Sequence, residues 1–246
     1  MIAAAVVLGP GVRRLPGVLA DLPVTTRDEL AADPERYARL VVCGSTAAVA
    51  AVAALAPRAA ISFGGAPELT GLFAIDPSPE AARARLEGGT EHPADLGLLQ
   101  QETGSRPFLA AVGAGGGAAL GLRFPWAHRR GPVSIRGSRN LEVDLARAVI
   151  VANTQLLGPW LVSPRAAVND SRLDIQVLSG SVIDLIRLRP ALRLGLHERF
   201  PGMRRMSVAE CEVIIPKSWR VACDGAPAGR GPFRVALQPG AATLLV

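Results

Sequence analysis

Gly44 lies where an apolar run ends and an alanine-rich run begins, and this turn is the first feature of the sequence that could do chemistry. The run Leu40–Cys43 is typical of a buried strand, and the Ala/Val segment that ends at Pro57 is typical of a helix. A glycine-rich turn between a strand and a helix presents backbone N–H groups at the positive end of the helix. Such a turn can hold a phosphate group.

A second glycine-rich segment, Gly113–Ala118, matches the dinucleotide-binding pattern Gly-x-Gly-x-x-Ala and follows the apolar run Phe108–Val112. A nicotinamide cofactor would also need an acidic residue about 20 positions further on, to bind the ribose hydroxyls. Arg136 and Arg139 occupy that stretch, and Glu142 comes late. We therefore do not expect a dinucleotide site here.

Other residue types with catalytic potential are sparse. The three histidines lie far apart, without metal-ligand spacing to the cysteines, and are expected to be cap or surface residues: His92, His128 and His197. The three cysteines are too few, and odd in number, for a disulfide framework. Cys211 and Cys223 lie in strand-like runs and are expected to be buried small hydrophobic residues. No serine has the context of a nucleophile elbow, which argues against acyl transfer.

Composition predicts a folded chain with a sizeable core. The 246 residues are 49% apolar and 20% charged, with 26 Gly and 20 Pro. This length suffices for one large domain or two smaller ones, and the composition excludes a disordered acidic or low-complexity chain. The low cysteine usage favours a reducing, cytoplasmic location.

Charge is distributed unevenly along the chain. Residues 1–100 carry 8 basic and 11 acidic side chains, net −3, whereas residues 101–246 carry 19 basic and 10 acidic, net +9. All but one of the basic residues are arginines, and the exception is Lys217. The asymmetry indicates two units, the second with either an anionic partner or a solvated basic face. Its two basic clusters are Arg123, His128, Arg129, Arg130, Arg136 and Arg139, and Arg199, Arg204 and Arg205.

Strands and helices alternate in the first part of the chain. Apolar runs predict strands at Ala3–Leu8, Leu40–Cys43 and Ala59–Phe63. Helix starts are indicated at Thr26, by a hydroxyl and two following acids, and at Pro79, where Ala82 and Leu86 share a face. Alternation of this kind predicts a parallel sheet that is covered on both faces.

After about residue 93 the pattern changes to many short strands between turn residues. These runs are Phe108–Val112, Val133–Ile135, Ala148–Ala152, Leu173–Leu178, Cys211–Ile215, Trp219–Ala222, Phe233–Leu237 and Ala242–Val246. One helical stretch interrupts them from Val182, and Pro190 is expected to kink or break it. We therefore expect an α/β domain over residues 1–92 and a β-rich domain over 93–246. The last strand, 241–246, is expected to pack back on the first domain.

Two uncharged stretches, 40–57 and 107–122, resemble membrane spans at first sight. Both fall short of the roughly 20 strongly apolar residues that a span needs, and both consist largely of Ala and Gly. The N-terminal run lacks the basic flank of a signal peptide. We expect a cytoplasmic protein that can also associate peripherally with a membrane.

The second half of the chain contains an ordered set of short motifs. Its centre is Ala148–Gly158, an asparagine-bearing strand and a glycine turn, followed by Ser163–Asp174. The flanking motifs are Ala94–Gly97 before it, and Gly195–His197, Val221–Gly229 and Gln238–Gly240 after it. In this order, these residues resemble the motifs of the diacylglycerol kinase and sphingosine kinase superfamily, and most closely its bacterial lipid kinases.

The resemblance implies both a fold and a nucleotide site. The implied fold is a truncated, Rossmann-like α/β amino-terminal domain with a parallel sheet, followed by an antiparallel β-sandwich domain. The family holds ATP with a Gly-Gly-Asp-Gly-Thr loop, which aligns with Cys43–Ala47 and points to Gly44, Ser45 and Thr46. Its second nucleotide motif aligns with Ser62–Glu68, which adds Gly64 and Gly65.

Several acidic residues of the family's chemistry are replaced here. Ala226 stands at the position of the glutamate that deprotonates the lipid hydroxyl, and an alanine side chain cannot accept a proton. Ser45 replaces the loop aspartate, and Asn169 replaces the first aspartate of the acidic turn. By resemblance, the remaining candidates are Asp224 as the base and, for Mg²⁺, the pair Asp170 and Asp174.

These replacements favour a lipid-kinase-fold protein that has lost the family's phosphate transfer. It would bind a lipid or another hydrophobic small molecule in its β-rich half, or regulate a partner, as a homo- or hetero-oligomer or alone. An anionic membrane surface is a further candidate partner. The first alternative is an atypical ATP-dependent lipid kinase that retains ATP and Mg²⁺ and acts on a diacylglycerol or sphingoid-type hydroxyl. The second is a basic nucleic-acid-binding module, against which the single tyrosine and few aromatic residues argue.

Overall fold

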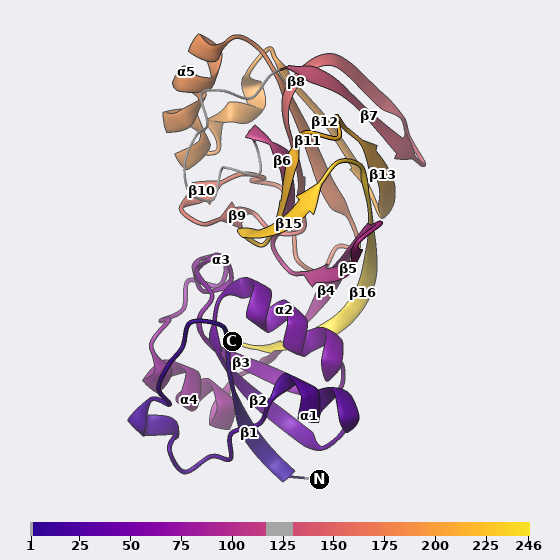
Figure 1. Ribbon diagram of the computed structural model, residues 1–246. Helices are drawn as coiled ribbons and strands as arrows, with labels where there is room; N and C mark the ends of the chain where they lie inside the picture. The colour runs from indigo at the N-terminus through magenta and orange to yellow at the C-terminus, as the bar shows by residue number, and fades with distance from the viewer. Residues whose placement is uncertain (1, 117–129) are drawn as a thin grey trace. The chain divides into compact units, whose positions relative to one another are not determined.

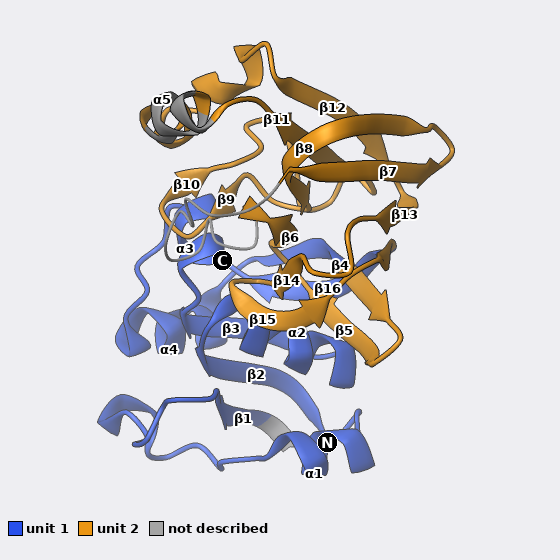
Figure 2. Cartoon of the chain, turned by 45° about the horizontal axis from the view of Figure 1, so that its top comes forward, with its two compact units in different colours: residues 1–96, 238–246 blue, residues 97–237 orange. Residues whose placement is uncertain are grey.

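The computed structural model describes residues 2–116 and 130–246, and the chain divides into two compact units (Figure 2). Unit 1 contains residues 1–96 and 238–246, and unit 2 contains residues 97–237. The sequence placed the division at 92/93, four residues before the end of the first segment of unit 1. The last nine residues return to unit 1, so that β16 (Phe233–Leu245) begins in one unit and ends in the other.

Unit 1 is built on a parallel sheet, as predicted (Figure 1). Its parallel strands are β1 (Ile2–Leu8), β2 (Tyr37–Gly44), β3 (Ala60–Gly65) and the end of β16, and the first part of β4 (Glu91–Gln101) belongs to the same unit. The order is β1-β2-β3-β16, and the end of β16 runs parallel to β3, with Thr243 opposite Ala60. Residues 40–43 of β2 are buried without alternation, which shows that both faces of this sheet are covered.

Short helices connect these strands: η1 (Gly17–Leu19), α1 (Arg27–Ala32), α2 (Thr46–Leu55), α3 (Pro67–Leu72) and α4 (Pro79–Gly88). The predicted start of α1 is confirmed as a capping box, in which Thr26 and Glu29 satisfy each other's backbone N–H groups. The predicted inner face of α4 is also confirmed, since Ala82 and Leu86 are buried against β2 and β3 residues.

Unit 2 is an antiparallel, sandwich-like β domain. Its further strands are β5 (Gly104–Phe108), β6 (Ala111–Gly115), β7 (Gly131–Gly137), β8 (Leu141–Ala152), β9 (Leu156–Leu157), β10 (Trp160–Leu161), β11 (Leu173–Ser179), β12 (Met203–Val208), β13 (Glu210–Ile214), β14 (Arg220–Cys223) and β15 (Ala226–Arg230). The long strand β8 pairs with β7 along its first half and with β6 and β11 along its second half.

Two apolar layers lie on opposite faces of the second half of β8. Val149 and Val151 belong to the sandwich interior, together with residues of β6, β7, β11, β13 and β14. Ala148 and Ile150 point to the other face, because side chains alternate along a strand. There they pack with residues of the β9–β10 hairpin and of α5 (Val182–Arg193).

The structure corrects three of the predicted elements of unit 2. The apolar run Phe108–Val112 is not one strand, because the chain bends at residues 109–110 between β5 and β6. The runs 233–237 and 242–246 are not two strands but parts of the single strand β16. Of the two predicted effects of Pro190, the break is wrong, since α5 continues to Arg193 and is followed by η3 (Leu196–Arg199), and the kink stays a prediction.

None of the helices within residues 2–116 and 130–246 is both long and apolar enough to cross a membrane. The uncharged stretch 40–57 forms β2 and α2, as predicted. The stretch 107–122 forms the end of the strand 104–108 and the strand β6, and its residues after 116 lie outside the described residues.

The glycine turns that follow β2 and β3 touch each other through the backbone. Gly65 has a φ of +88°, and a Cβ atom at this position would lie 2.6 Å from the Gly44 carbonyl oxygen. Ala66 N–H donates to the same carbonyl over 2.7 Å. Any side chain at position 65 therefore collides with the neighbouring turn, in addition to the strain of a positive φ.

We expect Gly65→Ala to lower the free energy of unfolding by about 2–3 kcal/mol, because the backbone must shift to relieve this collision. Gly88→Ala is the matched control, since a Cβ atom at Gly88 meets nothing within 4 Å and the residue ends α4. Urea denaturation followed by circular dichroism measures both variants. Equal stabilities of the two variants would contradict the close packing of the turns.

Candidate functional site

The predicted phosphate-binding residues of unit 1 lie together at the carboxyl ends of β2 and β3. Gly44 ends β2, Ser45 is the N-cap of α2, and Thr46 is the first residue of that helix. Gly64 and Gly65 end β3, directly beside them in the parallel register. The carboxyl edge of a parallel sheet is where ligands bind in folds of this kind.

The second glycine turn uses its N–H groups within the protein. Gly65 N–H donates to the Pro77 carbonyl over 2.9 Å, and Ala66 N–H donates to the Gly44 carbonyl over 2.7 Å. At the first turn, the Ser45 side chain makes no cap hydrogen bond to α2. The α2 end is thus the part of this site that retains the features of a phosphate-binding turn.

A buried hydrogen bond joins the two turns. The Thr46 hydroxyl donates to the Glu68 carboxylate over 2.5 Å, and both side chains are buried. Glu68 lies in the first turn of α3. It is the last residue of the second nucleotide motif in the sequence, which was predicted to contribute only its glycines to the site. Its position three residues after the glycine-rich end of β3 was the signal that could have identified it.

Asp224, the candidate base, is a buried residue of unit 2 whose carboxylate binds backbone groups. Its oxygens accept hydrogen bonds from Leu109 N–H at 2.9 Å, Ala110 N–H at 2.8 Å and Ala111 N–H at 2.9 Å. Its own N–H donates to the Ala111 carbonyl. These bonds hold the bend between β5 and β6. Asp224 thus has an architectural task, and its part in proton transfer stays a prediction.

Asn153 binds the same bend from the end of β8. Its side-chain Nδ2 donates to the Leu109 carbonyl over 2.9 Å, and its backbone N–H donates to the Ala110 carbonyl over 2.8 Å. Two buried polar side chains therefore satisfy the backbone groups that the bend removes from the strand ladder. Ala226 follows at the start of β15, opposite Cys223, and its methyl group supplies no proton acceptor.

The two candidate metal ligands lie in different local structures and bind different groups of the protein. Asp170 is exposed and accepts the Arg172 N–H over 3.0 Å, as in an Asx turn. Asp174, in β11, accepts the Ser163 hydroxyl over 3.1 Å. Within the two described stretches of chain, no three His, Cys, Asp or Glu residues lie close enough to hold a metal ion. Metal binding by this pair stays a prediction.

His197 is neither a cap nor a surface residue, contrary to the expectation from the sequence. It is 1% exposed, and its Nε2 lies 2.9 Å from the Val162 carbonyl and 3.1 Å from Gln176 Oε1. With two oxygen acceptors there, Nε2 carries the proton, and Nδ1 has no partner among the described residues. Burial lowers the pKa of His197 below its ordinary value, because the charged ring would lose its hydration.

The cysteines behave as predicted. All three are buried and free of disulfide bonds. Burial raises the pKa of the Cys211 thiol to about 12 and raises that of Cys223 as well, so neither forms a thiolate near neutral pH. Of the first basic cluster, Arg123, His128 and Arg129 lie outside the described residues, as does Ala118 of the dinucleotide pattern.

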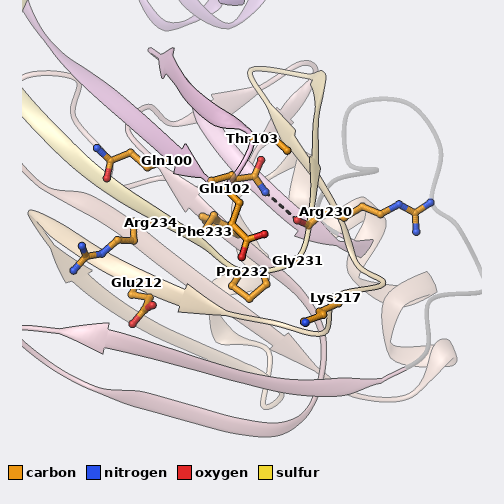
Figure 3. A pocket seen from close by; sticks show the side chains of 11 residues that line it. Gln100, Glu102, Thr103, Glu212, Lys217, Arg230, Gly231, Pro232, Phe233 and Arg234 are labelled. Carbon is orange, nitrogen blue, oxygen red and sulfur yellow. Dashed lines mark hydrogen bonds between the residues drawn. The ribbon is translucent and has the colours of Figure 1, made fainter.

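A pocket of about 530 Å³ opens on unit 2, and none of the predicted site residues is among those that line it (Figure 3). Charged side chains of both signs line it, among them Glu102, Glu212 and Lys217, the single lysine of the chain. One wall is fixed by a hydrogen bond from Gln101 Nε2 to the Arg230 carbonyl over 3.1 Å. Figure 3 shows the Arg230 side chain directed away from the others, so the charges do not converge on one point.

These two units define a lipid-kinase-like protein: a parallel α/β unit with glycine turns at the strand ends, and an antiparallel sandwich carrying the acidic motifs. Comparison with protein families supports this class. The family model described as the YegS C-terminal NAD kinase beta sandwich-like domain matches residues 120–246, which is more than half of the chain. The chain belongs to this family, within the diacylglycerol kinase and sphingosine kinase-like superfamily.

Solved structures show the same fold along the whole chain. Three solved structures from Bacillus anthracis str. Sterne, described as diacylglycerol kinases, two of them provisionally, superpose on 99% of this chain. Their TM-scores are 0.77, 0.76 and 0.73, at 16%, 15% and 14% identity, and 96%, 97% and 96% of their own chains are covered. The search of curated proteins finds no match.

Asp224→Asn is expected to lower the free energy of unfolding by about 2–4 kcal/mol. The amide offers one acceptor oxygen where three N–H donors converge, and its NH₂ group would face a donor. Asp170→Asn is the control, with a loss below about 0.5 kcal/mol, because an asparagine oxygen can still accept the Arg172 N–H at the surface. Equilibrium urea denaturation measures both. Equal stability of the two variants would show that the buried bonds of Asp224 contribute little.

Stability is expected to fall as pH falls from 7 to 5. The unfolded chain protonates His197 near pH 6.5, whereas in the folded chain, where burial lowers the pKa of His197, this proton is bound only at a lower pH. The unfolded state then binds more protons, so the free energy of unfolding rises with pH, by at most about 1.4 kcal/mol per pH unit for one site. His197→Gln keeps an N–H donor and should flatten this slope. An unchanged slope in denaturation at pH 7, 6 and 5 would refute the assignment.

Proposed function

We propose that this protein is a lipid-kinase-fold protein that binds a lipid or another hydrophobic small molecule and does not carry out the phosphate transfer of its family. The observation that carries the proposal is the pairing of Ala226 with Asp224. The position of the expected base bears a methyl group, and the nearest acidic residue in the sequence gives both carboxylate oxygens to backbone N–H groups.

The acceptor side of the reaction depends on a group that can take a proton from the lipid hydroxyl. General base catalysis accelerates a reaction by a factor of about 10²–10⁴, and a carboxylate must reach the substrate hydroxyl to act as the base. Asp224 is 6% exposed and would have to release the bend at residues 109–111 to turn toward a substrate. That release would leave three buried N–H groups without acceptors.

The nucleotide side fits ATP only in part. If ATP and Mg²⁺ are bound, the N-terminus of α2 with Ser45 and Thr46 would hold phosphate oxygens, and Asp170 and Asp174 would be the metal ligands. Mg²⁺ would supply charge neutralisation on the phosphates. However, Ser45 stands where the family has a carboxylate, and Gly65 and Ala66 donate their N–H groups to carbonyls of the protein. These features support weak nucleotide binding rather than turnover.

A radiolabelled ATP assay tests the proposal with diacylglycerol, sphingoid base and polyprenol acceptors. We expect no product above the protein-free blank, and a bound lipid in native mass spectrometry of the purified protein. Turnover that is lost in Asp224→Asn and kept in Asp144→Asn, a change at an exposed residue of β8 outside the candidate site, would overturn the proposal and establish an atypical lipid kinase. Circular dichroism must show that Asp224→Asn is still folded in the assay, since this variant is also expected to be less stable.

A further inference from the structure

We propose that unit 2 docks on an anionic lipid bilayer through the segment that joins α5 to η3. The docking surface consists of four exposed side chains, Arg193, Leu194, Leu196 and Arg199, and is called the leucine tip below. This inference rests on the proposed function only in that the protein acts on or binds lipids. It holds whether or not the chain transfers phosphate.

The two leucines are exposed although their segment is firmly anchored. Leu194 is 68% exposed and Leu196 is 54% exposed, whereas Leu192 before them and His197 after them are almost completely buried. Gly195 between them has a φ of +67°, and a Cβ atom there would lie 2.8 Å from the side chains of both Leu161 and Pro164. The glycine thus packs inward, and this backbone conformation leaves both leucines exposed to solvent.

Single exposed leucines are common on protein surfaces. Two leucines on one anchored turn expose a larger apolar area to water, which is unfavourable. The buried neighbours Leu192 and His197 anchor the segment, so the two exposed leucines are not needed to hold its fold. A pair of large apolar side chains that projects from an anchored turn is the arrangement with which a protein inserts into the boundary between headgroups and acyl chains.

The charge around the tip selects the kind of surface. Residues 182–205 contain six arginines and two acidic residues, net +4. Both acidic side chains interact with other groups of unit 2. Asp184 accepts the Ser181 N–H over 2.6 Å at the start of α5, and Glu198 forms ion pairs with Arg165 at 3.4 Å and Arg205 at 2.5 Å.

The arginines that flank the leucines are both exposed. Arg193 extends over the ring of Trp160, with its guanidinium carbon 5.2 Å from the ring centroid, and this contact holds the charge beside Leu194. A second copy of the chain would bring the same positive charges together. An anionic bilayer, by contrast, offers headgroups to the arginines and acyl chains to the leucines. Charge complementarity therefore favours the bilayer as the occupant of this surface.

The test is co-sedimentation of the full chain with two kinds of vesicle, phosphatidylcholine alone and an equal mixture with phosphatidylglycerol. Neither contains diacylglycerol, so binding reports the surface and not the ligand site. We expect binding to the anionic vesicles that weakens with added salt. The double variant Leu194→Ser/Leu196→Ser should reduce the partition coefficient at least about tenfold, because two apolar side chains no longer insert. Arg199→Gln should reduce it about fivefold.

Leu145→Ser is the matched control. Leu145 is 57% exposed, lies on β8 of the same unit and is not part of the leucine tip. Its replacement should change the partition coefficient less than about twofold, if the leucine tip is the docking surface. Thermal unfolding checks that all variants are folded.

Three results would overturn the proposal. The first is a wild-type chain that does not bind anionic vesicles, and the second is equal binding by the double variant and the wild type. The third is a concentration-dependent mass in sedimentation without vesicles that the double variant loses, which would make a second copy the occupant. The ATP assay of the proposed function uses none of these readouts, so failure of one proposal can be told apart from failure of the other.

Discussion

The carboxylate of Asp224 is the buried charge on which the β unit depends. A carboxylate without water is stable only when hydrogen bonds replace its hydration, and here the three N–H groups of residues 109–111 do so. The N–H groups depend on the carboxylate in turn, because at the bend none of the described neighbouring strands accepts their hydrogen bonds. The bend places Ala111 opposite Ala152 of β8 and Val112 opposite Cys223 of β14. One side chain thereby sets where three strands of the sandwich meet.

This constraint changes how the acidic residues of the family motifs should be interpreted. An aspartate that satisfies a buried bend is required for the fold whether or not the protein is an enzyme. Its presence therefore says little about catalysis, and the functional information lies at the neighbouring positions that the fold leaves free to vary. At Ala226 and Ser45 the side chains have no carboxylate, and neither position needs one for packing. The loss of phosphate transfer that we propose would therefore leave the architecture of the unit unchanged.

The parts of the fold that were predictable from the sequence depend on local signals. The uniformly apolar runs predicted β1 to β3, and the hydroxyl and acids after Thr25 predicted the capping box of α1. The bend at residues 109–110 was not predictable in this way, because the side chain that causes it is 115 residues away from Leu109. The burial of His197 depends likewise on Val162 and Gln176, which belong to other elements. In the candidate site, the glycine turns were located correctly, whereas the use of their N–H groups by Pro77 and Gly44 required the three-dimensional structure.

The excess positive charge of residues 101–246 also has a different meaning in the folded chain than in the sequence. Counted along the chain, it is compatible with phosphate, lipid or nucleic acid. In the structure, Glu198 is held between Arg165 and Arg205, so that part of the charge is balanced within the unit. The arginines beside the exposed leucines differ because apolar area accompanies them. Nucleic acid would match the charge but would leave Leu194 and Leu196 in water, whereas a bilayer accommodates both. The combination of an apolar pair with flanking arginines, and not the net charge, is what distinguishes a lipid surface from the other anionic partners.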